Sequence, residues 1–181
     1  MMACTTKCRS LVKRDEPGAT PISGKCRLQY HAEDFLTVPL RLALSLSFLF
    51  PVCDRLGFLG PPGTHGVDWG NFATFLAYTA QVNSFAPHVV VPFLGVAATI
   101  LETLFGITLL AGAGTRLTAV GSGALLCVFG TAMAISFGVK SPFDYSVFSA
   151  MGGSLLLAAW DKYPLSVDSM FPNHGEPDPQ T

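Results

Sequence analysis

The stretch Val91–Arg116, VPFLGVAATILETLFGITLLAGAGTR, decides the fold of this chain. It belongs to an apolar run of 26 residues, 87–112, whereas about 20 residues suffice for a helix to cross a bilayer. Glu102 lies near the middle of the run. A carboxylate at that depth costs about 2.5–3.5 kcal/mol on insertion scales unless it faces protein or water. We therefore predict a membrane-spanning helix whose acidic side chain faces the protein interior.

The residue spacing in this stretch separates two faces of the predicted helix. Small and polar residues recur every three or four positions on one face: Gly95, Thr99, Glu102 and Gly106. Large apolar residues occupy another face: Phe93, Ile100, Leu104 and Ile107. We expect the first face to pack against other helices and the second to contact lipid.

The composition of the whole chain supports a membrane protein. Of 181 residues, 50% are hydrophobic and 13% are charged, which is about half the charged share of a soluble domain. Apolar surface in this amount needs lipid to cover part of it. The net charge of -1 gives no reason to expect nucleic acid as a partner.

The patterns that hold common cofactors are missing from the apolar runs. Three of the four histidines lie outside the predicted spans, His31, His65 and His174, and His88 lies at the outer end of the second span. The chain has no C-x-x-C pair and no flavin or nucleotide fingerprint. We therefore expect no bound haem, flavin or metal, and a quinone is the cofactor that a redox function would use.

The predicted fold class is all-α: an integral membrane four-helix bundle occupying 34–163. The spans are placed at about 35–55, 87–112, 117–139 and 143–160. A short amphipathic helix containing Trp69 and Tyr78 is predicted between the first two spans. It either lies in the membrane interface, where Trp and Tyr are favoured, or caps the bundle over a cavity.

Local signals refine these spans. Pro51 is expected to bend or end the first span near Asp54 and Arg55. The fourth span is expected to begin with Ser141 as N-cap and Asp144 at the third helical position. In the third span a stripe of small residues predicts close helix contact: Gly123, Cys127, Gly130 and Ala134.

The two ends of the chain are predicted to be disordered. Residues 1–33 are basic and rich in Pro and Gly, and 164–181 are rich in Pro. Zinc binding at Cys4 and Cys8, with Cys26 and His31 further on, is an alternative for the first tail, but the spacing lacks a second tight pair. The disordered tail is therefore the preferred interpretation.

The distribution of Lys and Arg predicts the orientation. With four spans and a cytoplasmic N-terminus, nine basic residues fall inside and two outside. The inner set is Lys7, Arg9, Lys13, Arg14, Lys25, Arg27, Arg41, Arg116 and Lys162. The outer pair is Arg55 and Lys140. We predict a multi-pass protein of the plasma (inner) membrane with both termini in the cytoplasm.

Three charged residues are the candidate site residues. Glu102 is the catalytic candidate because an acid inside a span marks a functional site or a proton path. Arg41 and Arg116 are the binding candidates. Arg41 has two interpretations: an anchor that reaches the membrane interface, which we prefer, or a partner that pairs with Glu102.

Several segments together resemble the DoxX family of small four-helix membrane proteins. The similar segments are RLALSLSFLF at 41–50, GITLLAGAGTRLTA at 106–119, DRLGFLGPPG at 54–63, VDWGNFATFLAYTAQVN at 67–83 and GVKSPFDYSVFSA at 138–150. The resemblance covers about Leu36–Trp160. It implies kinship with the membrane subunit of a thiosulfate:quinone oxidoreductase, and Arg41, Glu102 and Arg116 match recurrent polar positions. It implies no catalytic motif.

Two functions follow from these observations. The chain is either the membrane subunit of a redox complex linked to quinone or thiol chemistry, or a non-enzymatic scaffold or small-molecule permeation protein. In the first case Glu102 accepts a proton from a quinol and electrons come from a partner protein or a diffusing cofactor. In the second case Glu102 and Arg41 form a structural pair. The lipid bilayer is a partner in both cases, and a homo-oligomer is compatible with either.

Overall fold

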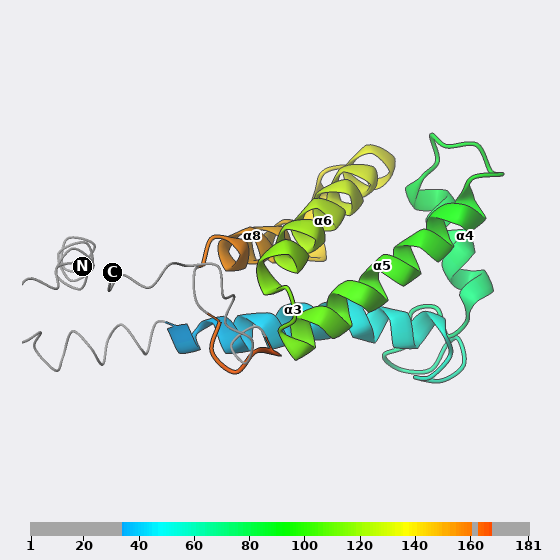
Figure 1. The fold of residues 1–181 in the computed structure, drawn as a ribbon. Coiled ribbons are helices and arrows are strands. Elements are labelled where there is room, and N and C mark those ends of the chain that lie inside the picture. Colours follow the sequence, from blue (N-terminus) through cyan, green and yellow to red (C-terminus); the bar gives the residue numbers. More distant parts are fainter. Residues whose placement is uncertain (1–33, 161–162, 168–181) are drawn as a thin grey trace, which may run out of the picture.

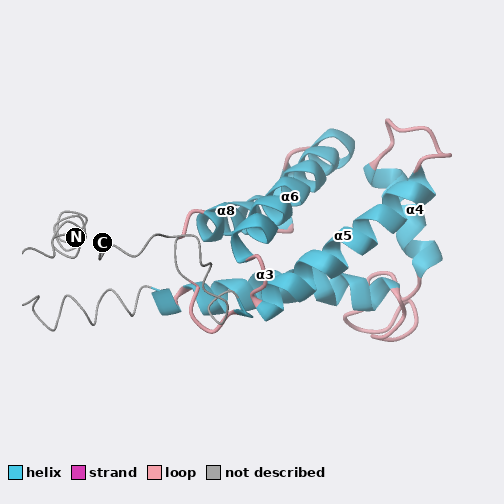
Figure 2. Cartoon of the chain, in the orientation of Figure 1, coloured by secondary structure: helices cyan, strands magenta, loops and turns pink. Residues whose placement is uncertain are grey.

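The computed structural model describes residues 34–160 and 163–167, and every regular element in these ranges is helical (Figures 1 and 2). The elements are α3 Thr37–Arg55, α4 Phe72–Val82, α5 Val91–Ala111, α6 Thr115–Phe137, α7 Lys140–Asp144 and α8 Val147–Ala158. The all-α prediction is confirmed for these ranges. The predictions for 1–33, with its zinc alternative, and for 168–181 lie outside the described residues.

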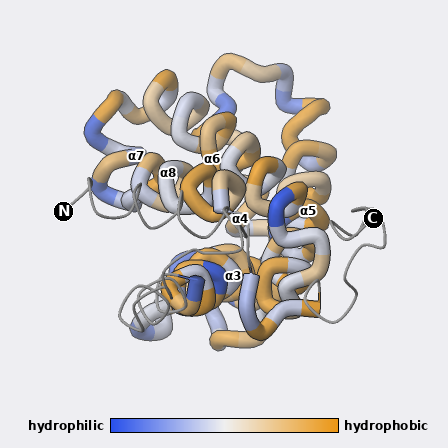
Figure 3. Tube along the Cα trace, turned by 60° about the vertical axis from the view of Figure 1, so that its left-hand side comes forward, coloured by the Kyte–Doolittle hydropathy of each residue, from blue (hydrophilic) through white to orange (hydrophobic). Residues whose placement is uncertain are grey.

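Three of the helices are long and apolar enough to cross a membrane. They are α3, α5 and α6, with 19, 21 and 23 residues. Hydrophobic residues predominate along the helices in Figure 3. The 12 residues of α8 rise only about 18 Å, less than the roughly 30 Å of a hydrocarbon core. A membrane protein with three spanning candidates is therefore what the fold supports directly.

The predicted fourth span, 143–160, is interrupted. α7 ends at Asp144, and Ser146 has a left-handed backbone with φ of 54° before α8 begins at Val147. A left-handed residue cannot continue a right-handed helix, so the two helices are separate. Ser141 makes no capping hydrogen bond, and Asp144 pairs with Lys140. The predicted helix start at Ser141 and the capping role of Asp144 are wrong.

The two predicted faces of α5 are confirmed. Gly95, Glu102 and Gly106 are buried, whereas the four large apolar residues of the other face are 53–72% exposed. At Gly106 the backbone approaches α3 closely, because a Cβ there would lie 2.7 Å from the Leu49 side chain. The Ser45 hydroxyl donates to the Gly106 carbonyl at 2.8 Å. This contact sets the register between the two antiparallel helices.

The close helix contact predicted for the small residues of α6 is confirmed at Gly123 and Gly130, which face α8. A Cβ on Gly123 would lie 3.1 Å from Leu155, and one on Gly130 would lie 2.8 Å from Phe148. Cys127 is instead exposed, so its predicted packing role is wrong. The helix pairs α3–α5 and α6–α8 form the two most extensive helix contacts in the described chain.

The described chain starts and finishes at the same end of the molecule. The indole N–H of Trp160, after α8, donates to Asp34 Oδ1 at 3.2 Å, just before α3. Residues 164–166 form a turn, and Ser166 is buried. The described chain thus continues as a turn past residue 163, and the prediction of disorder for 168–181 lies outside the described residues.

Candidate functional site

A cavity of about 380 Å³ lies among the helices, within the usual size range of small-molecule sites. Its walls are mostly apolar, and α5 and α6 contribute much of them: Leu94, Ala97, Ala98, Leu101, Leu125 and Phe129. Polar side chains reach it from three helices: Ser47, Arg55, Tyr78, Thr79, Asn83 and Glu102. An apolar space with a few polar groups is the usual form of a binding site.

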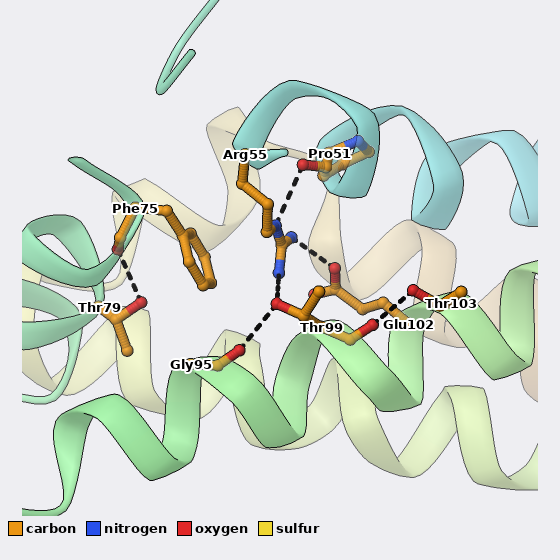
Figure 4. A network of polar contacts seen from close by, with 8 residues as sticks. All are labelled: Pro51, Arg55, Phe75, Thr79, Gly95, Thr99, Glu102 and Thr103. Carbon is orange, nitrogen blue, oxygen red and sulfur yellow. Dashed lines mark hydrogen bonds and ion pairs between the residues drawn. The ribbon is translucent and has the colours of Figure 1, made fainter. Parts of the chain in front are cut away.

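The charged part of the cavity wall is an ion pair between Arg55 and Glu102. Arg55 Nη2 lies 2.5 Å from Glu102 Oε2, and the two side chains are 2% and 7% exposed. The same guanidinium donates from Nη1 to Thr99 Oγ1 and from Nε to the Pro51 carbonyl, each at 3.1 Å (Figure 4). The predicted site residue Glu102 thus has an arginine partner, and that partner is Arg55.

Aromatic rings cover the other side of the guanidinium. Arg55 Cζ lies 4.0 Å from the ring centroid of Phe75 and 5.5 Å from that of Trp69. A desolvated cation–π contact is worth about 2 kcal/mol. Phe75 belongs to α4, which also lines the cavity. Of the two positions predicted for this short helix, α4 takes the one over a cavity. Its placement in a membrane interface stays a prediction.

Asp54, the neighbour of Arg55, positions the loop that carries Trp69. Its carboxylate accepts from the backbone N–H groups of Asp68, Trp69 and Gly70 at 2.9, 3.1 and 3.0 Å. Gly70 has φ of 63°, and a Cβ there would lie 2.5 Å from the backbone N of Pro62. Only glycine fits this conformation without displacing the loop. The last turn of α3 therefore positions both the ion pair and an aromatic wall of the cavity.

Tyr78 provides a neutral hydroxyl at the cavity. Burial raises its pKa above the ordinary value of 10.0, and the charges of Tyr145 and Asp68 raise it further. The phenol therefore keeps its proton at physiological pH. The ring packs 5.6 Å from Trp69, measured between centroids, so α4 and the preceding loop form a continuous aromatic wall.

Arg41 lies away from this cavity and is not the partner of Glu102. Its side chain is buried, with the residue only 4% exposed. It donates to the carbonyls of Leu109 and Leu110, at the end of α5, and to those of Pro164 and Leu165. The predicted pairing of Arg41 with Glu102 is therefore wrong, whereas its role as an anchor at the membrane interface stays a prediction.

The helix register explains why Glu102 pairs with Arg55. Since Ser45 bonds Gly106, residue 41 lies level with residue 110 and residue 55 with residue 96. Arg41 is thus about eight residues, or 12 Å, from Glu102 along the axis, and Arg55 about six residues, or 9 Å. Side chains lean toward the N-terminus of their own helix. In this antiparallel pair Arg55 and Glu102 lean toward each other, whereas Arg41 leans away.

The remaining binding candidate, Arg116, is exposed near the start of α6 and does not line the cavity. Sequence reasoning missed Arg55 because it was counted among the outer loop residues. The direction of the side chains, combined with an assumed antiparallel pairing, is the signal that would have found it. A scan against models of known protein families, a search of curated proteins and a search of solved structures each gave no significant match.

Proposed function

We propose that this chain is a DoxX-like integral membrane protein that binds a quinone in the cavity and serves as the membrane subunit of a redox complex. The observation that carries the proposal is an apolar cavity inside a set of membrane-spanning helices with the Arg55–Glu102 pair in its wall. The apolar walls suit a quinone ring and its tail, and the ion pair supplies a donor and a proton acceptor.

Glu102 is the proton acceptor in this proposal. When a bound quinol is oxidised, two electrons pass to a redox partner protein and two protons leave the quinol, one of them onto the Glu102 carboxylate and the other to water. Arg55 holds that carboxylate in place and is a positioning residue for the transfer. A partner protein is required because Arg and Glu side chains move protons rather than electrons.

The proposed location is the plasma membrane, with four crossings and both termini in the cytoplasm. Two observations support this topology: the excess of Lys and Arg on one side, and the hydrogen bond that brings Trp160 next to Asp34. A reporter fused after Thr181 is expected to be active in the cytoplasm. A reporter active only outside the membrane would overturn the topology.

A second candidate function is a non-enzymatic scaffold or permeation protein. Arg55 favours it, because its guanidinium joins α3 to Thr99 and Glu102 of α5 and packs on Phe75 of α4. A buried pair that ties three helices together has a structural use whether or not a ligand binds. Homo-oligomerisation is compatible with both functions.

The variant Glu102→Gln separates the two functions. It keeps the shape of the side chain and removes its charge. Normal yield with loss of quinone-dependent turnover, measured on purified protein with its partner, supports the redox function. Failure of the variant to accumulate in the membrane supports the structural function.

Quinone extracted from the purified protein provides the binding test. Ala98 lines the cavity, so Ala98→Phe should fill part of it and lower the amount of co-purifying quinone. Ala124 is exposed on α6 and does not line the cavity, so Ala124→Phe is the matched control. Equal quinone content in wild type and both variants would count against binding in the cavity.

A further inference from the structure

We propose that the occupant of the cavity is a neutral, membrane-dissolved molecule that enters sideways from the lipid between α5 and α6 and places a carbonyl-type oxygen on Arg55. This inference rests on the proposed function and adds to it the route of entry and the group that recognises the ligand. Lateral entry and docking on Arg55 depend on separate observations.

The first observation concerns the cavity wall between α5 and α6, where two lining side chains are also exposed on the outside. Near the Gly112–Gly114 turn the two helices close on each other, because a Cβ on Gly121 would lie 2.8 Å from Phe105. Farther from that turn, Leu101 and Val128 both line the cavity and are 39% and 63% exposed on the molecular surface. Side chains that face both a cavity and the outside mark its mouth.

The mouth lies at mid-depth in the membrane-spanning helices. Leu101 is ten residues from each end of α5, Val91 and Ala111. The large apolar residues exposed beside it on α5 include Ile100 and Leu104. The mouth therefore opens into hydrocarbon rather than water. A charged molecule is strongly disfavoured there, so this route selects a neutral one.

The second observation is a set of Arg55 donors that the described residues leave available. A guanidinium has five N–H groups, and three of them donate to Pro51, Thr99 and Glu102. Within 34–160 and 163–167 no further acceptor receives the other two. The side chain is 2% exposed and lines the cavity. A ligand oxygen is the acceptor that completes this set.

Charge decides the nature of that oxygen. The Arg55 cation is already balanced by the Glu102 anion at 2.5 Å. An anionic ligand would add an unbalanced charge to a buried site, whereas a carbonyl oxygen accepts hydrogen bonds without doing so. The site therefore fits a neutral ketone-type or quinone-type head with an apolar body.

Stopped-flow fluorescence of the full chain in lipid nanodiscs tests the entry route. The chain has two Trp residues, so Trp160→Phe leaves Trp69, at the cavity wall, as the only indole. Decylubiquinone, the probe, quenches it on binding. Val128→Phe narrows the mouth and should slow association and dissociation together by about threefold, with Kd changed by less than about twofold. Val120→Phe, at an exposed site on α6 outside the cavity lining, should leave both rates unchanged.

The source of the ligand is tested by varying the lipid. If the ligand enters from the bilayer, doubling the amount of nanodisc lipid at constant total decylubiquinone should lower the association rate about twofold, because the quinone is diluted in the membrane. Anthraquinone-2-sulfonate, an anionic and water-soluble probe, should show no saturable quenching. Saturable binding of the sulfonate, or a rate independent of lipid, would overturn lateral entry.

Infrared difference spectroscopy tests docking on Arg55. Decylubiquinone with ¹³C-labelled carbonyls should show one C=O band shifted to lower frequency in the wild-type complex. Arg55→Lys keeps the charge but loses the planar array of donors, and should abolish the shift and weaken binding by about tenfold. An unshifted carbonyl in the wild type overturns the docking even if the lysine variant does not fold.

The outcomes separate this inference from the proposed function. If wild-type protein shows no saturable quenching by decylubiquinone, quinone binding and the inference both fail. If wild type binds but the rates of Val128→Phe equal those of Val120→Phe, lateral entry fails and quinone binding stands.

Discussion

Two arginines on one helix, fourteen residues apart, have opposite surroundings. Arg41 and Arg55 both lie on α3 and are 4% and 2% exposed. Arg41 donates to backbone carbonyls where α5 ends and in the turn after α8. Arg55 donates to a carboxylate and a hydroxyl and lies against an aromatic ring at a cavity.

The partners described for the two arginines differ in whether they can change their charge. Backbone carbonyls at a helix C-terminus attract a cation and cannot change their charge. The Glu102 carboxylate can gain or lose a proton, and it faces a space where a ligand fits. Arg41 therefore joins the ends of helices. Arg55 instead joins the protonation of Glu102 to the occupancy of the cavity.

Removing the Arg55 cation should have the largest effect. Arg55→Met leaves Glu102 buried without its partner, and we expect a loss of about 3–5 kcal/mol of stability. Removing both charges, in Arg55→Met with Glu102→Leu, should restore more than half of that loss. Thermal unfolding in detergent, followed by circular dichroism, measures both. A double variant no more stable than the single one would show that the pair is not the dominant interaction.

Removing Arg41 should have a smaller effect. Arg41→Met leaves several buried carbonyls without a donor, and we expect a loss of about 2–3 kcal/mol. The same unfolding measurement applies. Arg116→Met is the control, because Arg116 is exposed and such a change is expected within about 0.5 kcal/mol of wild type. Equal losses of stability in Arg41→Met and Arg55→Met would contradict the proposed difference between the two arginines.

Disturbing the register between the two arginines should have the smallest effect of the three. Gly106→Ala places a methyl group against Leu49, and we expect a loss of about 1–2 kcal/mol. Gly152→Ala on α8 is the matched control, because a Cβ there meets nothing within 4 Å and should add up to about 1 kcal/mol of helix propensity. Cysteine cross-linking between α3 and α5 would report any change of register in the Gly106 variant.

The periodicity of the sequence was enough to predict the α5 helix and both of its faces. The spacing of Gly95, Glu102 and Gly106 follows the helical repeat, and the large apolar residues on the opposite face are exposed. The end of α3 at Arg55, just after Pro51, was also predictable, because proline removes one backbone donor. These features depend on residues near one another in the chain.

The site itself depended on contacts between distant residues. Arg55 and Glu102 are 47 positions apart, and no local pattern states which of two arginines an acid will meet. The choice follows from the Gly106 register and the direction of the side chains, which only the packed helices display. The break at Ser146 was missed for a similar reason, since a left-handed serine has no strong sequence signal.

The adjacency of Asp54 and Arg55 has a mechanical consequence. Successive residues point about 100° apart around a helix, so the two side chains leave α3 in different directions. Asp54 is tied to the 68–70 backbone and Arg55 to α5. Two ties at this angle restrain the last turn of α3 from rotating about its axis, although Pro51 removes a backbone hydrogen bond from the turn before it. The end of α3 is therefore held in one rotational position about the helix axis.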